Sequence, residues 1–113
     1  MKATVLRLYM HEGRRFHGML LYEWLLEQAR RIGIPGGSAF RAIAGYGRHG
    51  MLHEQHYFEL AGELPVVTEF IVSEADAARI LELVRREKVD LVYASWPAEH
   101  AAVNPRESGQ SGS

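Results

Sequence analysis

The sequence of 113 residues contains no cysteine. Disulfide-stapled scaffolds, zinc sites built from thiolates and thiol nucleophiles are therefore excluded. An excess of one charge is also lacking, because 13 Lys and Arg stand against 14 Asp and Glu. Proteins that coat DNA or RNA usually carry a clear basic excess, so we expect no nucleic-acid partner. No apolar run approaches the roughly 18 residues of a membrane-spanning helix.

The N-terminal segment carries Lys2 and then Arg7 inside its apolar run, which does not match a signal peptide. We therefore expect a soluble cytoplasmic protein. A chain of this length builds one hydrophobic core. We expect one domain over residues 1–103 and a disordered polar tail over 104–113. Six His and eleven Gly stand out in the composition.

Hydrophobic periodicity predicts four strands and two helices. The strands are expected over residues 3–10, 38–46, 65–72 and 90–96, the last ended by Pro97. The first helix is expected over residues 20–32, with Leu21, Trp24 and Leu25 on one face and Gly33 as its terminator. The second helix is expected to begin after Ser73, whose side chain caps it.

This order of elements, strand–helix–strand–strand–helix–strand, predicts an α+β fold. We expect a ferredoxin-like βαββαβ sandwich, in which two helices cover one face of a four-stranded antiparallel sheet. The first and third strands are then the adjacent central pair. This fold alone implies little about function.

Three charged residues lie in the middle of strands: Arg7, Arg41 and Glu69. We expect Glu69 to lie between the two arginines on the sheet face away from the helices. The same face is expected to carry the apolar residues Val5, Tyr9, Ile43, Val67 and Ile71. This face is too apolar for open water, which favours an oligomer interface over a solvated sheet face.

The segment Gly45-Tyr46-Gly47-Arg48-His49-Gly50 begins where the second strand is expected to end. The connection onward to Leu64 is long for a hairpin, and such long loops are usually functional or mobile. Its glycines allow close approach of a ligand, its N–H groups can form an anion nest, and Arg48 is a forked donor for phosphate. The alternative is a flexible turn with basic residues, and the residues alone favour neither interpretation.

Several separated motifs resemble one small bacterial and archaeal family of PII-like proteins. They are Met1-Lys2-Ala3-Thr4-Val5-Leu6-Arg7, Leu21-Tyr22-Glu23, Arg41-Ala42-Ile43-Ala44-Gly45-Tyr46-Gly47 and Glu63-Leu64-Pro65-Val66-Val67. The resemblance runs from residue 1 to about residue 96. The stretch around Gly45 is also similar to the root of the T-loop in PII signalling proteins, with Tyr46 for Phe and His49 for Gln.

The resemblance implies a homotrimer whose sheets line a central core. It further implies an adenine nucleotide (AMP, ADP or ATP) in the cleft between subunits, with its phosphates at Gly45, Gly47 and Arg48. His49 replaces the Gln that helps PII proteins hold a metal, and imidazole suits magnesium less well than oxygen does. The T-loop of such proteins docks on a membrane transporter or an enzyme.

The chain departs from PII proteins at residues 85–90, where it lacks the glycine-rich loop that precedes their last strand. A separate basic cluster follows the first strand and consists of His11, Arg14, Arg15 and His17. It adds positive potential near a ligand cleft or is a solvated loop, and the second interpretation is favoured.

The histidines His49, His53 and His56 are weak candidates for a divalent metal site. A metal-binding trimer like the CutA proteins is therefore the alternative function, although solvated loop histidines are favoured. No spacing of Ser, His, Asp or Glu indicates a catalytic set, so we expect no enzyme activity.

Overall fold

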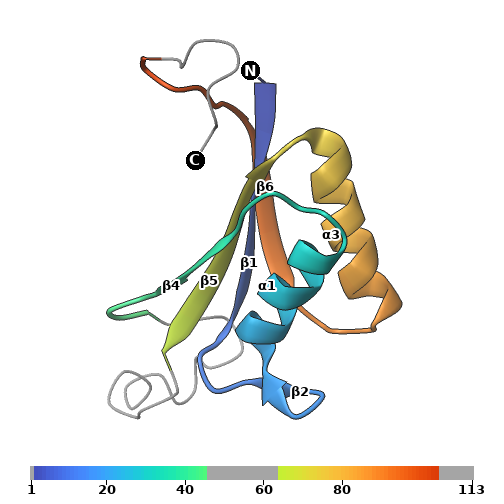
Figure 1. Ribbon diagram of the computed structural model, residues 1–113. Helices are drawn as coiled ribbons and strands as arrows, with labels where there is room; N and C mark the ends of the chain where they lie inside the picture. Colours follow the sequence, from blue (N-terminus) through green and yellow to red (C-terminus); the bar gives the residue numbers. More distant parts are fainter. Residues whose placement is uncertain (1, 46–63, 105–113) are drawn as a thin grey trace.

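The computed structural model describes residues 2–45 and 64–104 of the chain. The order of elements is strand, short hairpin, helix, strand, strand, helix, strand (Figure 1). Their bounds are β1 Lys2–His11, β2 Arg15–Phe16, β3 Met19–Leu20, α1 Leu21–Arg31, β4 Ser38–Arg41, β5 Pro65–Val72, α3 Glu74–Arg86 and β6 Val92–Glu99. The expected tail lies mostly outside the described residues.

Four of the strands form one antiparallel sheet in the order β4-β5-β1-β6. β1 and β5 are the central pair, with Leu6 opposite Phe70 and Leu8 opposite Thr68. Both helices lie on the same face of this sheet (Figure 1). The predicted ferredoxin-like α+β fold is therefore confirmed.

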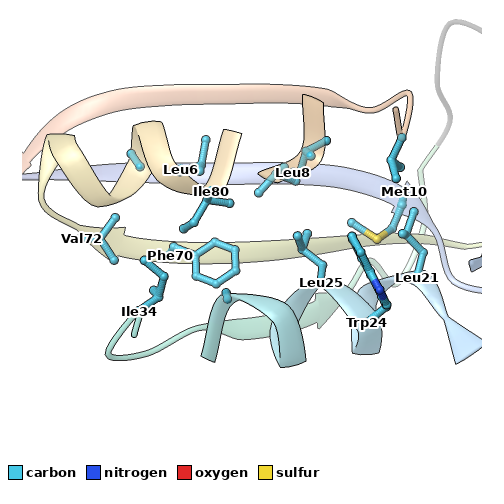
Figure 2. Packing of buried hydrophobic residues seen from close by; sticks show 14 of the residues in the cluster. Leu6, Leu8, Met10, Leu21, Trp24, Leu25, Ile34, Phe70, Val72 and Ile80 are labelled. Carbon is cyan, nitrogen blue, oxygen red and sulfur yellow. The ribbon is translucent and has the colours of Figure 1, made fainter. Parts of the chain in front are cut away.

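The hydrophobic core fills the space between the sheet and the helices. Alternate residues of β1 point into it, because successive side chains of a strand face opposite sides. Figure 2 shows Leu6, Leu8 and Met10 directed toward the side chains of the two helices. The helices contribute Leu21, Trp24, Leu25, Ala29, Ala77, Ile80 and Val84.

The second helix begins as predicted. Ser73 is its N-cap, and the Ser73 Oγ accepts a hydrogen bond from the backbone N–H of Asp76 at 3.1 Å. This bond satisfies one of the amide groups that a helix start leaves without an internal partner. The Asp76 carboxylate pairs with Arg79 of the next turn.

Two strand boundaries differ from those predicted. β4 ends at Arg41 rather than at residue 46, because its partner strand β5 begins at Pro65 and proline supplies no N–H for a longer ladder. β6 continues through Pro97 to Glu99 rather than ending before the proline. It is an edge strand, and an edge tolerates proline where its nitrogen lies on the unpaired side.

A short hairpin, β2–β3, occupies part of the segment expected to be a loop. Its two-residue turn is His17-Gly18, and both residues have positive φ, 52° and 81°. Positive φ at both positions is the pattern of a type I′ turn, which matches the twist of antiparallel strands. The hairpin packs on α1 through Phe16 and Trp24, whose ring centroids are 4.7 Å apart.

No helix within the two described ranges is long and apolar enough to cross a bilayer.

Candidate functional site

The sheet face opposite the helices, here called the open face, is largely apolar. Odd-numbered residues of β1 and their cross-strand partners share it, because directly paired residues point to the same side. Phe40 is 52% exposed and Trp96 is 41% exposed. Its large apolar members are Val5, Tyr9, Phe40, Val67, Ile71, Val92 and Trp96. In the described ranges no helix covers it (Figure 1).

The centre of the open face carries an ion pair. Arg7 of β1 lies opposite Glu69 of β5, with Arg7 Nη2 2.7 Å from Glu69 Oε2. Arg7 Nε donates a second bond to the same oxygen at 2.8 Å. The guanidinium carbon also lies 5.5 Å from the centre of the Trp96 ring. The hydrogen bond with Glu69 raises the pKa of Arg7 above its ordinary value, so the guanidinium stays charged.

The expectation that Glu69 lies between two arginines is wrong. The residue of β4 opposite Glu69 is Ser38, and Arg41 lies opposite the buried Val66. Arg41 therefore projects to the helix side of the sheet, where its Nη2 lies 2.6 Å from Oε2 of Glu12. Phe40, rather than Arg41, belongs to the open face. Pairing with β5 decides which face of the sheet each side chain of the short strand β4 occupies, and the alternation of residue types within β4 does not.

The segment that begins at Gly45 leaves the sheet at one end. The described residues around this point are here called the loop root, which consists of Glu12, residues 41–45, Leu64 and Pro65. The backbone N–H of Ala42 donates to the Pro65 carbonyl at 2.9 Å, and that of Glu12 donates to the Leu64 carbonyl at 2.8 Å. These bonds tie together the ends of β1, β4 and β5.

Gly45 is the last described residue of the motif. A Cβ atom at this position would lie 3.1 Å from Cγ of Pro65, which leaves little room for a side chain. The close contact gives a physical reason for glycine here. The other candidates for anion or metal binding, Tyr46, Gly47, Arg48, His49, Gly50, His53 and His56, lie outside the described residues.

The junction between α3 and β6 lacks glycine, as noted from the sequence, yet it contains a positive φ. Lys88 has a φ of 60°, a conformation that glycine adopts more readily than other residues. Arg14 Nη1 donates to the carbonyl of Asp90 at 2.7 Å, and His17 Nε2 lies 3.6 Å from Glu87 Oε1. Part of the basic cluster is therefore engaged in holding the hairpin to this junction.

The hairpin and both of these long-range contacts were not predicted from the sequence. A signal for the hairpin was present, because His17-Gly18 is a two-residue turn flanked by Phe16 and Met19. No pattern in the sequence linked Arg14 to Asp90.

Metal ligation finds no support in the part of the chain that the structure describes. Within residues 2–45 and 64–104, no three side chains of the His, Asp and Glu types gather as a metal site would require. The proposed ligands His49, His53 and His56 fall outside these ranges, so the metal alternative stays a prediction.

Solved structures identify the class of fold. The chain is similar to a proposed PII-like signalling protein of Thermus thermophilus, with a TM-score of 0.59 and 22% identity over 86% of this chain and 87% of that one. It is also similar to CPII of Thiomonas intermedia K12, a nitrogen regulatory PII-like protein bound to ADP, AMP and bicarbonate. That match has a TM-score of 0.62 and 14% identity, and covers 90% of this chain and 96% of CPII. The fold is that of PII-like proteins.

Sequence comparison identifies the family. The family model DUF190, Uncharacterized ACR, matches residues 3–98. A UPF0166 protein of Aquifex aeolicus (strain VF5) is 37% identical over 100 residues, which cover 81% of this chain and 95% of the relative. A UPF0166 protein of Methanocaldococcus jannaschii is 36% identical over 80 residues, 71% of this chain and 73% of the relative. The chain belongs to the DUF190 family, as the resemblance in its motifs indicated.

Proposed function

We propose that this protein is a PII-like regulatory protein without catalytic activity of its own. A homotrimer binds a small anionic effector, an adenine nucleotide such as AMP, ADP or ATP, at the clefts between subunits. The loop of residues 45–64 then signals to a membrane transporter or an enzyme from the cytoplasm.

The observation that carries the nucleotide proposal is the construction of the loop root. The Ala42 N–H donates to the Pro65 carbonyl, and a Cβ atom at Gly45 would lie 3.1 Å from Cγ of the same proline. The motif thus starts at the end of the sheet, where backbone hydrogen bonds join the strands. CPII, a protein of the same fold, is bound to ADP and AMP. In our proposal the phosphates contact Gly45, Tyr46, Gly47, Arg48, His49 and Gly50.

The trimer proposal rests on the open face. A sheet face that exposes Phe40, Ile71, Val92 and Trp96 together is more apolar than a monomer's surface usually is. Packing three such faces around a common axis removes these side chains from water. The Arg7–Glu69 pair then becomes buried with its charges already compensated.

Titration calorimetry with AMP, ADP and ATP, with and without magnesium, tests the nucleotide proposal. We expect binding of at least one nucleotide, and absence of binding at millimolar concentration contradicts the proposal. Arg48→Ala should weaken binding by about 1.5–3 kcal/mol, the range for a hydrogen bond to a charged group. Arg31→Ala is the matched control, because Arg31 is an exposed α1 arginine that pairs with Glu27 of the same helix.

A further inference from the structure

Arg41 is the last residue of β4 and belongs to the loop root. Its strand ends at this residue, and its side chain crosses β5 to reach Glu12 beyond the end of β1, with 2.6 Å between Nη2 and Oε2. We infer that Arg41 is an anion-binding residue, which Glu12 holds in the ligand-free protein and which transfers to a phosphate of the bound effector. This inference rests on the proposed function, because it places an anionic effector at the loop root.

The side chains of Arg41 and Glu12 differ in their freedom to move. The backbone of Glu12 is fixed by its hydrogen bond to the Leu64 carbonyl, and the Glu12 side chain is only 21% exposed. The Arg41 side chain is 61% exposed and long, so it is the partner that can turn toward a ligand. The pair is open to water on the Arg41 side, and an ion pair that solvent reaches contributes little to stability, so exchanging the carboxylate for a phosphate costs the fold little.

The position of Arg41 suits a phosphate ligand. It directly precedes Ala42, whose N–H donates to the Pro65 carbonyl, and a Cβ atom at Gly45 would lie 3.1 Å from Cγ of the same proline. Arg41 and the first glycine of the motif therefore both lie near Pro65. A guanidinium presents forked donors that match phosphate geometry and form stronger hydrogen bonds than neutral donors do.

Three other arginines illustrate the contrast. Arg7 is engaged on the open face by Glu69, and Arg14 and Arg79 each donate to a backbone carbonyl of a distant element. Each of these contacts joins strands or packs one element on another. Arg41 instead joins the end of β4 to a single carboxylate at the loop root.

Two consequences follow for binding. Removal of the Arg41 guanidinium removes a donor from the effector, so affinity falls. Removal of the Glu12 charge frees Arg41 from its competitor, so affinity rises. A gain of affinity is informative, because a variant that merely damages the fold does not bind its ligand more tightly.

The test is titration calorimetry with ADP and ATP on the full chain and on Arg41→Ala, Arg41→Lys, Glu12→Gln and the double variant. We expect about a tenfold or greater loss for Arg41→Ala, in line with the loss of a charged hydrogen bond. Arg41→Lys should recover part of it, and Glu12→Gln should bind several-fold more tightly than the unmodified chain. In the Arg41→Ala background, Glu12→Gln should bring no gain.

Glu27→Gln is the matched control. Glu27 also pairs with arginines, Arg30 and Arg31, but within α1, and its replacement should leave nucleotide affinity unchanged. If the unmodified chain binds no adenine nucleotide, the proposed function fails and this inference fails with it. If it binds normally and both Glu12→Gln and Arg41→Ala bind equally well, this inference alone is overturned.

Discussion

Arg7 of β1 and Glu69 of β5 form an ion pair across the two central strands, with 2.7 Å between Nη2 and Oε2. Glu69 is the more enclosed partner, with 16% of its side chain exposed against 41% for Arg7. Apolar side chains surround the pair on the open face. A pair in such surroundings matters most when a second molecule covers it and removes the remaining water.

The pair therefore gives a test of the proposed assembly. Breaking a buried ion pair by removing one partner costs roughly 3–5 kcal/mol, whereas replacing both by apolar residues is often neutral or stabilising. We expect Glu69→Ala to dissociate the trimer and the double change Arg7→Met with Glu69→Leu to preserve it. Sedimentation velocity over a range of concentrations measures the distribution of species.

Glu82→Gln serves as the control for that experiment, because Glu82 pairs with Arg85 on the exposed side of α3. It should assemble like the unmodified protein. A monomeric unmodified protein would contradict the trimer itself. An intact trimer in Glu69→Ala would instead place the ion pair outside the interface.

Thr68 offers a test of core energetics. Its side chain is fully buried in β5, opposite Leu8, and its hydroxyl oxygen has no hydrogen-bond partner among the described residues. An unsatisfied buried polar group costs about 1–3 kcal/mol. Thr68→Val keeps the shape and removes the hydroxyl, so we expect urea denaturation to report a gain of about 1 kcal/mol or more.

A loss of stability in Thr68→Val would mean that the hydroxyl has a partner in solution, such as a buried water. Thr4→Val, a substitution at a partly exposed position of β1, is a suitable comparison and should change stability much less.

Glu27 provides a prediction on pH. Hydrogen bonds from Arg30 and Arg31 lower the pKa of Glu27 below its ordinary value. A carboxylate with a lowered pKa stabilises the folded state above its unfolded pKa, and that contribution is lost as pH falls through its folded pKa. We expect Glu27→Gln to lower the melting temperature slightly at pH 7. This difference from the unmodified protein should shrink as the pH falls from neutral through the lowered pKa of Glu27.

Thermal unfolding across that pH range checks the prediction, and Glu82→Gln is again the control because Glu82 has one arginine partner rather than two. A difference that stays the same at acidic pH, where Glu27 is protonated, would indicate that Glu27 acts through packing rather than charge.

Local patterns predicted most of the fold. The alternation of side chains between two faces predicted the bounds of β5, residues 65–72, because a half-buried strand keeps this alternation along its whole length. The capping role of Ser73 followed from the residues next to it. The last residue of β4 and the sheet face that Arg41 occupies were not predictable in this way, because a four-residue edge strand takes its register from its neighbour.

The candidate site was predicted only in part. The segment beginning at Gly45 is visible in the sequence and the family match confirms the family resemblance, while the binding role of the segment stays a prediction. The partnership of Arg41 with Glu12 was not predictable, because these residues meet only after β1, β5 and β4 align. Contacts of this kind depend on the tertiary arrangement and leave no local pattern.

Gly37 gives the sharpest test of packing around the start of β4. A Cβ atom at this position would lie 2.5 Å from Cε1 of Phe70 and 3.1 Å from Cδ2 of Leu26. Phe70 is almost completely buried, so its ring has little room to move. Overpacking of a core typically costs about 1–3 kcal/mol, and we expect Gly37→Ala to lower the free energy of unfolding by that amount.

Gly36→Ala is the neighbouring control, because a Cβ atom there meets nothing within 4 Å and should leave stability nearly unchanged. A second arm combines Gly37→Ala with Phe70→Leu, which removes the ring that causes the clash. In that background the cost of Gly37→Ala should shrink. Urea denaturation of the unmodified chain, the two single variants and the double variant gives the coupling energy between positions 37 and 70. Equal stability of Gly37→Ala and Gly36→Ala would contradict the proposed contact, because only the Gly37 position lies against the Phe70 ring.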